Sequence, residues 1–112
     1  MAWYTFSQNN SGGHFVLDKQ QGLTNYVLIE GDTMEQILEK AEDIGIYFNG
    51  CEMDRDCPCC GDRWSEPWDD ELDKEPLIYG TTPEEVIEKG YGWMERGYEI
   101  VLHYKNGEMQ WM

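Results

Sequence analysis

The sequence predicts one α+β domain over residues 1–112, in which a sheet of about five strands carries two helices on one face. Three observations lead to this prediction. Segments 31–40 and 80–89 share a strand–cap–helix pattern, and short apolar runs at both ends of the chain are typical of strands. A cysteine-rich acidic stretch, 49–76, shows no periodicity. The sheet is expected to be antiparallel or mixed, and a loop of that length needs a staple.

The N-terminal part predicts two strands, Ala2 to Ser7 and Phe15 to Leu17. Between them lies the segment 8–13, which is rich in Asn, Ser and Gly and is expected to be a loop.

The first helix is predicted from Met34 to about Ile44, after a short strand from Tyr26 to Ile29. Thr33 and Gln36 form a capping box at its start, and Gly45 ends it. Its apolar side chains fall on one face and are expected to point into the core: Met34, Ile37, Leu38, Ala41 and Ile44.

The second helix is predicted from Pro83 to about Arg96, after a strand from Leu77 to Tyr79. Thr82 and Glu85 repeat the capping box, and proline suits the first helical position. Inward side chains are expected at Val86, Ile87, Tyr91 and Met94. The likeness of 31–40 to 80–89 is open to two interpretations, a true repeat or a coincidence of a common pattern.

The C-terminal segment predicts a β-hairpin. A strand from Tyr98 to Tyr104 is followed by Asn106-Gly107, a type I′ turn signal, and by a returning strand from Glu108 to Met112.

The charge of the chain is its most unusual bulk property. Twenty-three Asp and Glu against eight Lys and Arg give a formal net charge of −15. Such a surface repels nucleic acid and anionic membranes and attracts basic protein surfaces. No signal peptide and no membrane span are visible, so we expect a cytoplasmic protein.

The cysteines predict a zinc site. Cys57-Pro58-Cys59-Cys60-Gly61 is a C-P-x-C-G turn, in which Cys57 and Cys60 have the spacing of two metal ligands, and Cys51 is a natural third. The fourth ligand stays open between Cys59 and His14, followed by His103, Asp54 or Asp56. Thiolate ligands and the lack of an H-x-E or HExxH motif favour a structural ion. Reduced thiols, or a redox C-x-x-C pair, are the alternatives.

The segment after the cysteines combines aromatic and acidic side chains. It is predicted to bind a partner protein through Trp64, Glu66, Trp68, Asp69, Asp70, Glu71 and Asp73. The alternatives are a merely solvated acidic run and tryptophans that cover the metal loop.

A second candidate site is the N-terminal loop, whose amides and hydroxyls can bind a phosphate or a base edge. Its residues are Gln8, Asn9, Asn10, Ser11, Gly12 and Gly13, with Trp3, Tyr4 or His14 beside them. The alternative is a long hairpin turn held by Asn side chains. No catalytic triad is visible, because Ser7, Ser11 and Ser65 lack an elbow motif. We therefore expect no enzyme, and a metal-dependent enzyme is kept as the third hypothesis.

Two strings of the sequence carry a resemblance. They are Trp3-Tyr4-Thr5-Phe6-Ser7-Gln8-Asn9-Asn10-Ser11-Gly12-Gly13-His14-Phe15 and Asp56-Cys57-Pro58-Cys59-Cys60-Gly61-Asp62-Arg63-Trp64. Together they cover about a fifth of the chain, and they resemble a family of small uncharacterised proteins of tailed bacteriophages. The resemblance implies expression in the host bacterial cytoplasm and favours a role in host takeover or anti-defence, but it assigns no catalytic residues.

The functional hypothesis is therefore a small acidic phage-type binding protein with structural Zn²⁺. It acts as an inhibitor of a host or defence protein by occupying a basic surface, without direct contact to nucleic acid or membrane. The alternative is a small-molecule or nucleotide sequestering protein that uses the 7–14 loop. The sequence leaves the oligomeric state open.

Overall fold

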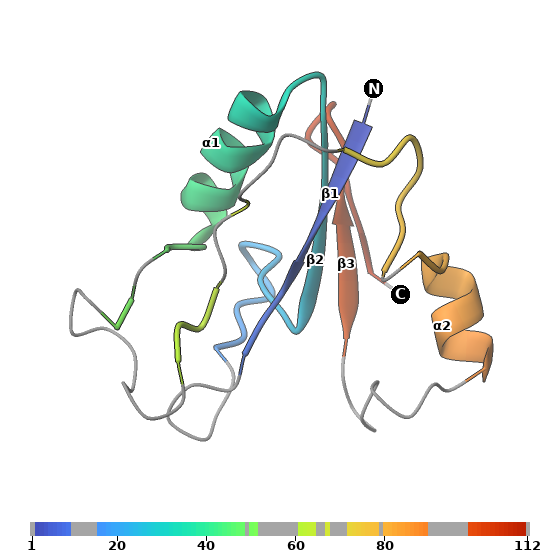
Figure 1. Cartoon of the computed structure of the whole chain (residues 1–112), viewed down its shortest axis with the longest axis horizontal. Helices are drawn as coiled ribbons and strands as arrows, with labels where there is room; N and C mark the ends of the chain where they lie inside the picture. The colour runs from blue at the N-terminus through green and yellow to red at the C-terminus, as the bar shows by residue number, and fades with distance from the viewer. Residues whose placement is uncertain are drawn as a thin grey trace.

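A four-stranded mixed sheet forms the centre of the protein (Figure 1). The computed structural model describes residues 2–9, 16–48, 50–51, 61–64, 67, 72–78, 80–89 and 99–111. The strands are β1 (Ala2–Ser7), β2 (Tyr26–Gly31), β3 (Ile100–His103) and β4 (Met109–Trp111), in the spatial order β1-β2-β3-β4. β1 and β2 are antiparallel, β2 and β3 are parallel, and β3 and β4 are antiparallel. The prediction of an α+β fold with a mixed sheet is confirmed.

The strand count is lower than predicted, because two expected strands are not formed within the described residues. Val16 and Leu17 lie in irregular backbone, and Ile78 makes only an isolated bridge to Thr81. The reason at Val16 is a side chain. Gln8 Oε1 accepts a hydrogen bond from the Val16 N–H at 2.6 Å, and Gln8 Nε2 donates to the Val16 carbonyl at 3.0 Å. Both backbone groups are thus satisfied without a neighbouring strand.

The two helices cover opposite faces of the sheet, so the prediction that both lie on one face is wrong. Figure 1 shows α1 (Met34–Ile44) on one side and α2 (Pro83–Lys89) on the other. The physical reason is two-sided burial of β2, whose alternate residues face opposite cores. Val27 and Ile29 pack in the core that contains the α1 side chains, whereas Tyr26 and Leu28 pack in the core that contains Val86 of α2.

Helix α1 begins and ends where the sequence predicts. Thr33 Oγ1 accepts a hydrogen bond from the Gln36 N–H at 3.2 Å, and Gly45, with φ +108°, forms the left-handed C-cap. The Gln36 side chain reaches one residue further back than a capping box requires, to the Asp32 N–H at 2.9 Å. Leu38, one of the five residues predicted to point inward, is only partly buried. The other four are buried: Met34, Ile37, Ala41 and Ile44.

Helix α2 starts at Pro83 as predicted, and its description ends at Lys89. Thr82 Oγ1 faces the Glu85 N–H at 3.4 Å. Val86 is fully buried, but Ile87 is 50% exposed, so the prediction that Ile87 points inward is wrong. A single stripe through Pro83 and Val86 meets the sheet, and the next residue turns away from it. Tyr91 and Met94 lie outside the described residues.

The C-terminal hairpin is confirmed in its turn. Asn106 Oδ1 accepts from the Glu108 N–H at 2.9 Å, and Gly107 takes a φ of +94°. β3 is buried along its whole length, whereas every residue of β4 is exposed. β4 is also the last strand in the order of the sheet.

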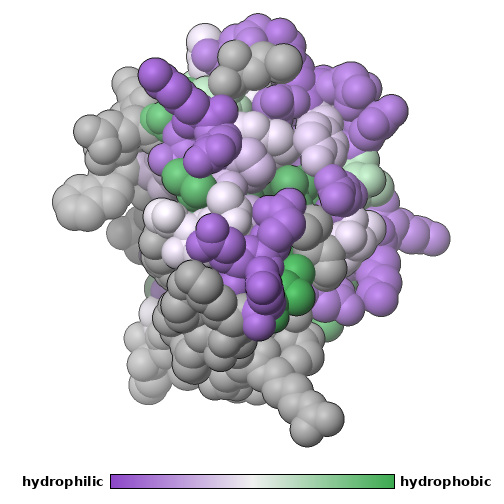
Figure 2. Space-filling view, turned by 90° about the vertical axis from the view of Figure 1, so that its right-hand side faces the viewer, coloured by the Kyte–Doolittle hydropathy of each residue, from purple (hydrophilic) through white to green (hydrophobic). Residues whose placement is uncertain are grey.

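Two surface observations complete the fold. The described residues on the face seen in Figure 2, which lies on the α2 side, are mostly hydrophilic or near-neutral, with hydrophobic side chains in small separate areas. Neither helix of the described part of the chain is long and apolar enough to span a bilayer.

Candidate functional site

The cysteine segment, residues 51–62, contains all four cysteines, and a hydrogen bond joins its two ends. The Cys51 N–H donates to Asp62 Oδ1 at 2.9 Å, so Cys51 and Asp62 lie together although eleven positions separate them in the chain. Hydrogen bonds from Cys51, first from its backbone N–H and then from its side chain, hold the pKa of the Asp62 carboxyl below its usual value. Cys51 is half-buried at this junction. The closure brings the predicted third ligand close to the chain that leaves the C-P-x-C-G turn.

A polar network fastens residues 61–64 to the end of β1. The Asn9 N–H donates to the Arg63 carbonyl at 2.8 Å, and Asn9 Nδ2 donates to the Asp62 carbonyl at 3.2 Å. Arg63 is itself buried; its Nη1 donates to Gln8 Oε1 at 3.2 Å and its Nε to the Tyr47 hydroxyl at 3.3 Å. A buried guanidinium needs such partners to offset its desolvation. The exit of the cysteine segment is thereby fixed to the fold.

Gln8 is the centre of this network and is not available to a ligand. Its Nε2 donates to the carbonyls of Val16 and Thr24, both at 3.0 Å, and its Oε1 accepts from Val16 and Arg63. Only 8% of the residue is exposed. The prediction of Gln8 as a ligand residue is therefore corrected, because its amide holds the loop onto the sheet. Asn9 is exposed, and Asn10, Ser11, Gly12, Gly13 and His14 lie outside the described residues.

The two aromatic residues proposed beside that loop are also structural. Trp3 is 5% exposed and meets the Tyr104 ring edge-on, with centroids 5.3 Å apart. Tyr4 is half-buried and packs edge-on against Phe6 at 4.8 Å. Such pairs stabilise a small core rather than present a stacking platform.

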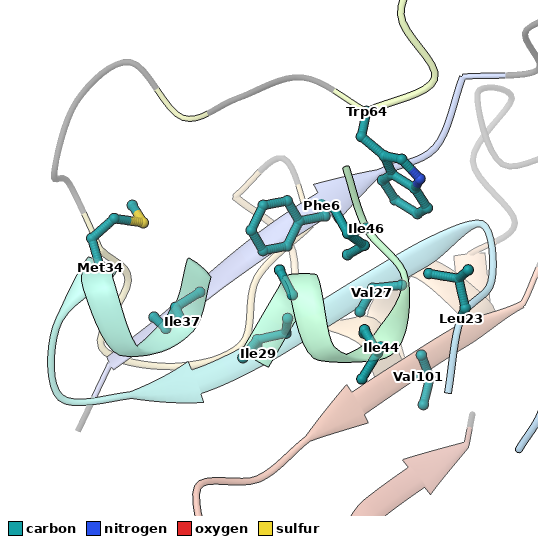
Figure 3. Close-up of a cluster of buried hydrophobic side chains, with 11 residues drawn as sticks. Phe6, Leu23, Val27, Ile29, Met34, Ile37, Ile44, Ile46, Trp64 and Val101 are labelled. Atoms are coloured by element: carbon teal, nitrogen blue, oxygen red, sulfur yellow. The ribbon is translucent and has the colours of Figure 1, made fainter. Parts of the chain in front are cut away.

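Trp64 belongs to the core and not to the surface. Its side chain is 1% exposed and packs in the α1-side cluster with residues that include Phe6, Leu23 and Ile46 (Figure 3). The prediction of Trp64 as a partner-binding residue is therefore wrong, because a buried ring cannot reach a partner. Its indole Nε1 has no hydrogen-bond partner among the residues that the structure describes. The ring closes the core at the point where the chain leaves the cysteine segment.

His103, one of the proposed fourth ligands, is buried in β3. Its Nε2 lies 2.8 Å from the Gly22 carbonyl, which fixes the tautomer with Nε2–H as donor, while the buried Nδ1 has no partner within the described part of the chain. Burial lowers the pKa of His103, against an opposing contribution from the Gly22 carbonyl. Cys57, Cys59, Cys60, Asp54 and Asp56 lie outside the described residues, as does His14. Within the described ranges no group of three or more His, Cys, Asp or Glu side chains gathers, so the zinc prediction stays a prediction.

The acidic segment after the cysteines is fixed at its C-terminal end. Asp73 is exposed, while its backbone N–H and carbonyl pair with Trp3 at 3.0 and 2.8 Å along the open edge of β1. Leu72 packs against the α1-side core. Glu66, Trp68, Asp69, Asp70 and Glu71 lie outside the described residues. The Asp73 carboxylate remains a candidate contact.

The structure shows an acidic ridge that the sequence reasoning missed. Glu35, Glu39, Glu42 and Asp43 are all exposed and are spaced i, i+4, i+7 and i+8 on α1, which places them on one stripe of the helix. No cation among the described residues forms an ion pair with them; the two ion pairs seen there join Lys19 to Glu99 and Lys105 to Asp32. The signal in the sequence was this i, i+4 spacing of carboxylates.

Three hollows follow the ridge. One of about 610 Å³ lies at the C-terminal end of α1, one of about 360 Å³ lies beside its middle, and one of about 430 Å³ lies at its N-terminal end. Neighbouring hollows share residues, because Glu42 lines the first two and Glu35 lines the last two. Leucines supply apolar lining to each in turn: Leu23, Leu38 and Leu72. The ridge is therefore bordered by a row of shallow recesses, each lined by both acidic and apolar side chains.

Comparison with known proteins gives one result. No curated protein and no solved structure matches this chain. A family model described as "Domain of unknown function (DUF7296)" matches residues 1–112, which is the whole chain. The protein belongs to this family of domains of unknown function.

Proposed function

We propose that this chain is a non-enzymatic acidic binding protein that occupies a basic surface of a host or defence protein. The observation that carries the proposal is the acidic ridge of α1, where four exposed carboxylates stand without a cationic partner among the described residues. A net charge of −15 surrounds the ridge with a negative field. Complementary fields steer association and raise its rate, so binding is expected to be fast and salt-sensitive.

The ridge is costly for the helix that bears it, and this supports a role outside folding. Like charges at i, i+4 destabilise an isolated helix by roughly 0.2–0.5 kcal/mol per pair, and Glu35 with Glu39 and Glu39 with Asp43 are two such pairs. Glu42 and Asp43 lie in the last turn, where the negative end of the helix dipole disfavours them, and no basic residue lies in that turn. A cationic partner would relieve all of these repulsions.

We further propose a structural zinc ion held by Cys51, Cys57 and Cys60, with the fourth ligand open as above. The Cys51–Asp62 hydrogen bond supports this, because it joins the two ends of the segment that contains all four cysteines. Thiolates suit Zn²⁺, and the ion would supply folding energy rather than Lewis acidity. Elemental analysis of the reduced protein tests this; an apo protein that melts cooperatively after chelation contradicts it.

A phage-type origin is part of the proposal and is supported by the resemblance of the two strings quoted above. It makes a bacterial host protein the expected partner. The alternative, a nucleotide binder, cannot use Gln8 as a ligand residue, because the side-chain amide of Gln8 is already hydrogen-bonded within the fold. What remains of that site lies mostly outside the described residues.

The experiment is capture of partners from bacterial lysate on the immobilised full chain. We expect a small set of proteins with basic surfaces, bound at about 50 mM salt and released near 500 mM, because salt screens complementary charges. Partners that stay bound equally at both salt concentrations would contradict the proposal. A thermal shift with a nucleotide panel tests the alternative; a clear stabilisation by one nucleotide would favour it instead.

A further inference from the structure

The face of α1 presents charge and apolar recesses in the same place. Leu38 is half-buried between the carboxylates and lines the middle hollow together with Met34, Glu35, Glu39 and Glu42. The hollow at the C-terminal end of the helix adds apolar lining from Val16, which is 39% exposed, and from Leu23. An acidic ridge with apolar recesses differs from a uniformly solvated face, because it has room for side chains as well as charge.

The charge on this face is mostly negative, although Lys105 pairs with Asp32, which lines the hollow at the N-terminal end of α1. Within the described residues, neither lysine nor arginine lines any of the three hollows, whereas Asp18, Asp32 and the ridge carboxylates do. The one lysine of α1, Lys40, lines a separate hollow with Glu30 and Lys105. The face therefore selects a cationic occupant over a second copy of this chain, whose net charge of −15 would repel it.

The shape of the face selects the form of the occupant. α1 has 11 residues, which span about 16 Å at 1.5 Å per residue. The recesses lie in a row along it. A helix that lies alongside presents anchors at i and i+7 about 10 Å apart, with further anchors at i+3 and i+4 between them. The row of recesses thus fits apolar anchors on one face of a helix, and the ridge fits the lysines and arginines that flank them.

We propose that the ridge of α1 and its recesses form the docking site for a cationic amphipathic helix of the partner protein. This inference rests on the proposed function and gives it a place and a ligand class. The site touches the acidic segment predicted from the sequence, because Leu72, which lies within that segment, lines the hollow at the start of α1. Leucine or similar anchors enter the recesses, and basic side chains pair with Glu35, Glu39, Glu42 and Asp43.

The chain offers a matched pair of charge reversals as the test. Glu35→Lys with Glu39→Lys changes the second and sixth residues of α1, and Glu84→Lys with Glu88→Lys changes the second and sixth residues of α2. Both variants alter the net charge equally and at equal positions in a helix. The probe is a peptide of about 18 leucines and lysines patterned as an amphipathic helix, and its isomer of the same composition with scattered leucines serves as control.

We expect the wild-type chain to bind the patterned peptide more tightly than the scattered one. The α1 reversal should weaken binding of the patterned peptide about 10- to 100-fold, and the α2 reversal by no more than a few-fold, because only the first removes contacts as well as field. Leu38→Ala should weaken binding of the patterned peptide but not of the scattered one. Ile87→Ala on α2 should leave the affinity for both peptides unchanged. Circular dichroism checks folding, and Glu35→Gln with Glu39→Gln replaces the reversal if that variant is unfolded.

Each outcome decides between the proposals. Equal losses from the α1 and α2 reversals, or equal affinity for the two peptides, would overturn the docking site. If lysate partners are still captured and released by salt in those cases, the proposed function is kept, but the binding surface is not α1. A chain that binds neither peptide and captures no salt-sensitive partner contradicts both.

Discussion

Removal of the Trp64 ring is the sharpest test of how the cysteine segment is held to the fold. The side chain is 1% exposed and packs in the cluster of Figure 3. A tryptophan of this kind buries about 150–250 Å², which at about 25 cal/mol per Å² corresponds to about 4–6 kcal/mol as an upper estimate. Measured Trp→Ala changes in cores cost about 3–5 kcal/mol. We therefore expect Trp64→Ala to lower the free energy of unfolding by about 3–5 kcal/mol.

The assay is thermal and urea unfolding followed by circular dichroism. For a chain of 112 residues a loss of that size lowers the Tm by about 12–20 °C. Trp111 is the matched control, because it is 36% exposed on the edge strand β4, and its replacement by alanine should cost less than about 1 kcal/mol. Trp64→Phe should have a stability near that of wild type, since it keeps a six-membered aromatic ring in the core and removes the Nε1–H. That group has no partner among the described residues, and burying such a group costs about 1–3 kcal/mol. A Trp64→Ala protein no less stable than Trp111→Ala would refute the reasoning.

Three further predictions follow from single contacts. Gly22→Ala should lower the free energy of unfolding by at least about 2 kcal/mol. The reason is that Gly22 has φ +74° and a Cβ there would lie 2.4 Å from His103 Cε1. A Tm that stays within about 2–3 °C of the wild-type value would be incompatible with that geometry. His103 has a lowered pKa, so the unfolded chain binds more protons than the folded one as the pH falls below 6.5. Stability should therefore be full above that pH and decline below it, and His103→Gln should flatten the slope of stability between pH 7 and 5; an equal slope in both proteins would exclude His103 as its source. Asp62→Ala removes the acceptor of the Cys51 N–H and should therefore let a chelator extract the bound metal faster. Extraction at the wild-type rate would show that Asp62 does not support the proposed zinc site.

Much of the local structure was predictable, because it depends on neighbouring residues. The limits of α1 follow from Thr33 as N-cap and Gly45 as left-handed C-cap, and both interactions reach only a few residues along the chain. The same holds for Asn106-Gly107 in the hairpin turn. The acidic excess and the metal-type spacing of the cysteines are likewise properties of the sequence alone.

The placement of the helices and of the site residues was decided by tertiary packing. A four-residue apolar run such as Tyr26–Ile29 is compatible with one buried face or two, and only the packing of both cores shows that α1 and α2 lie on opposite sides. Gln8 and Trp64 carry side chains that suit a ligand loop or an exposed anchor as well as a core. Their true roles depend on residues far along the chain, Arg63 for the one and Phe6 for the other, and such distant contacts leave no local pattern. The sequence by itself determined the limits of α1, the hairpin turn and the charge, and the tertiary structure decided which charged and apolar faces are exposed, because burial depends on how separate elements meet.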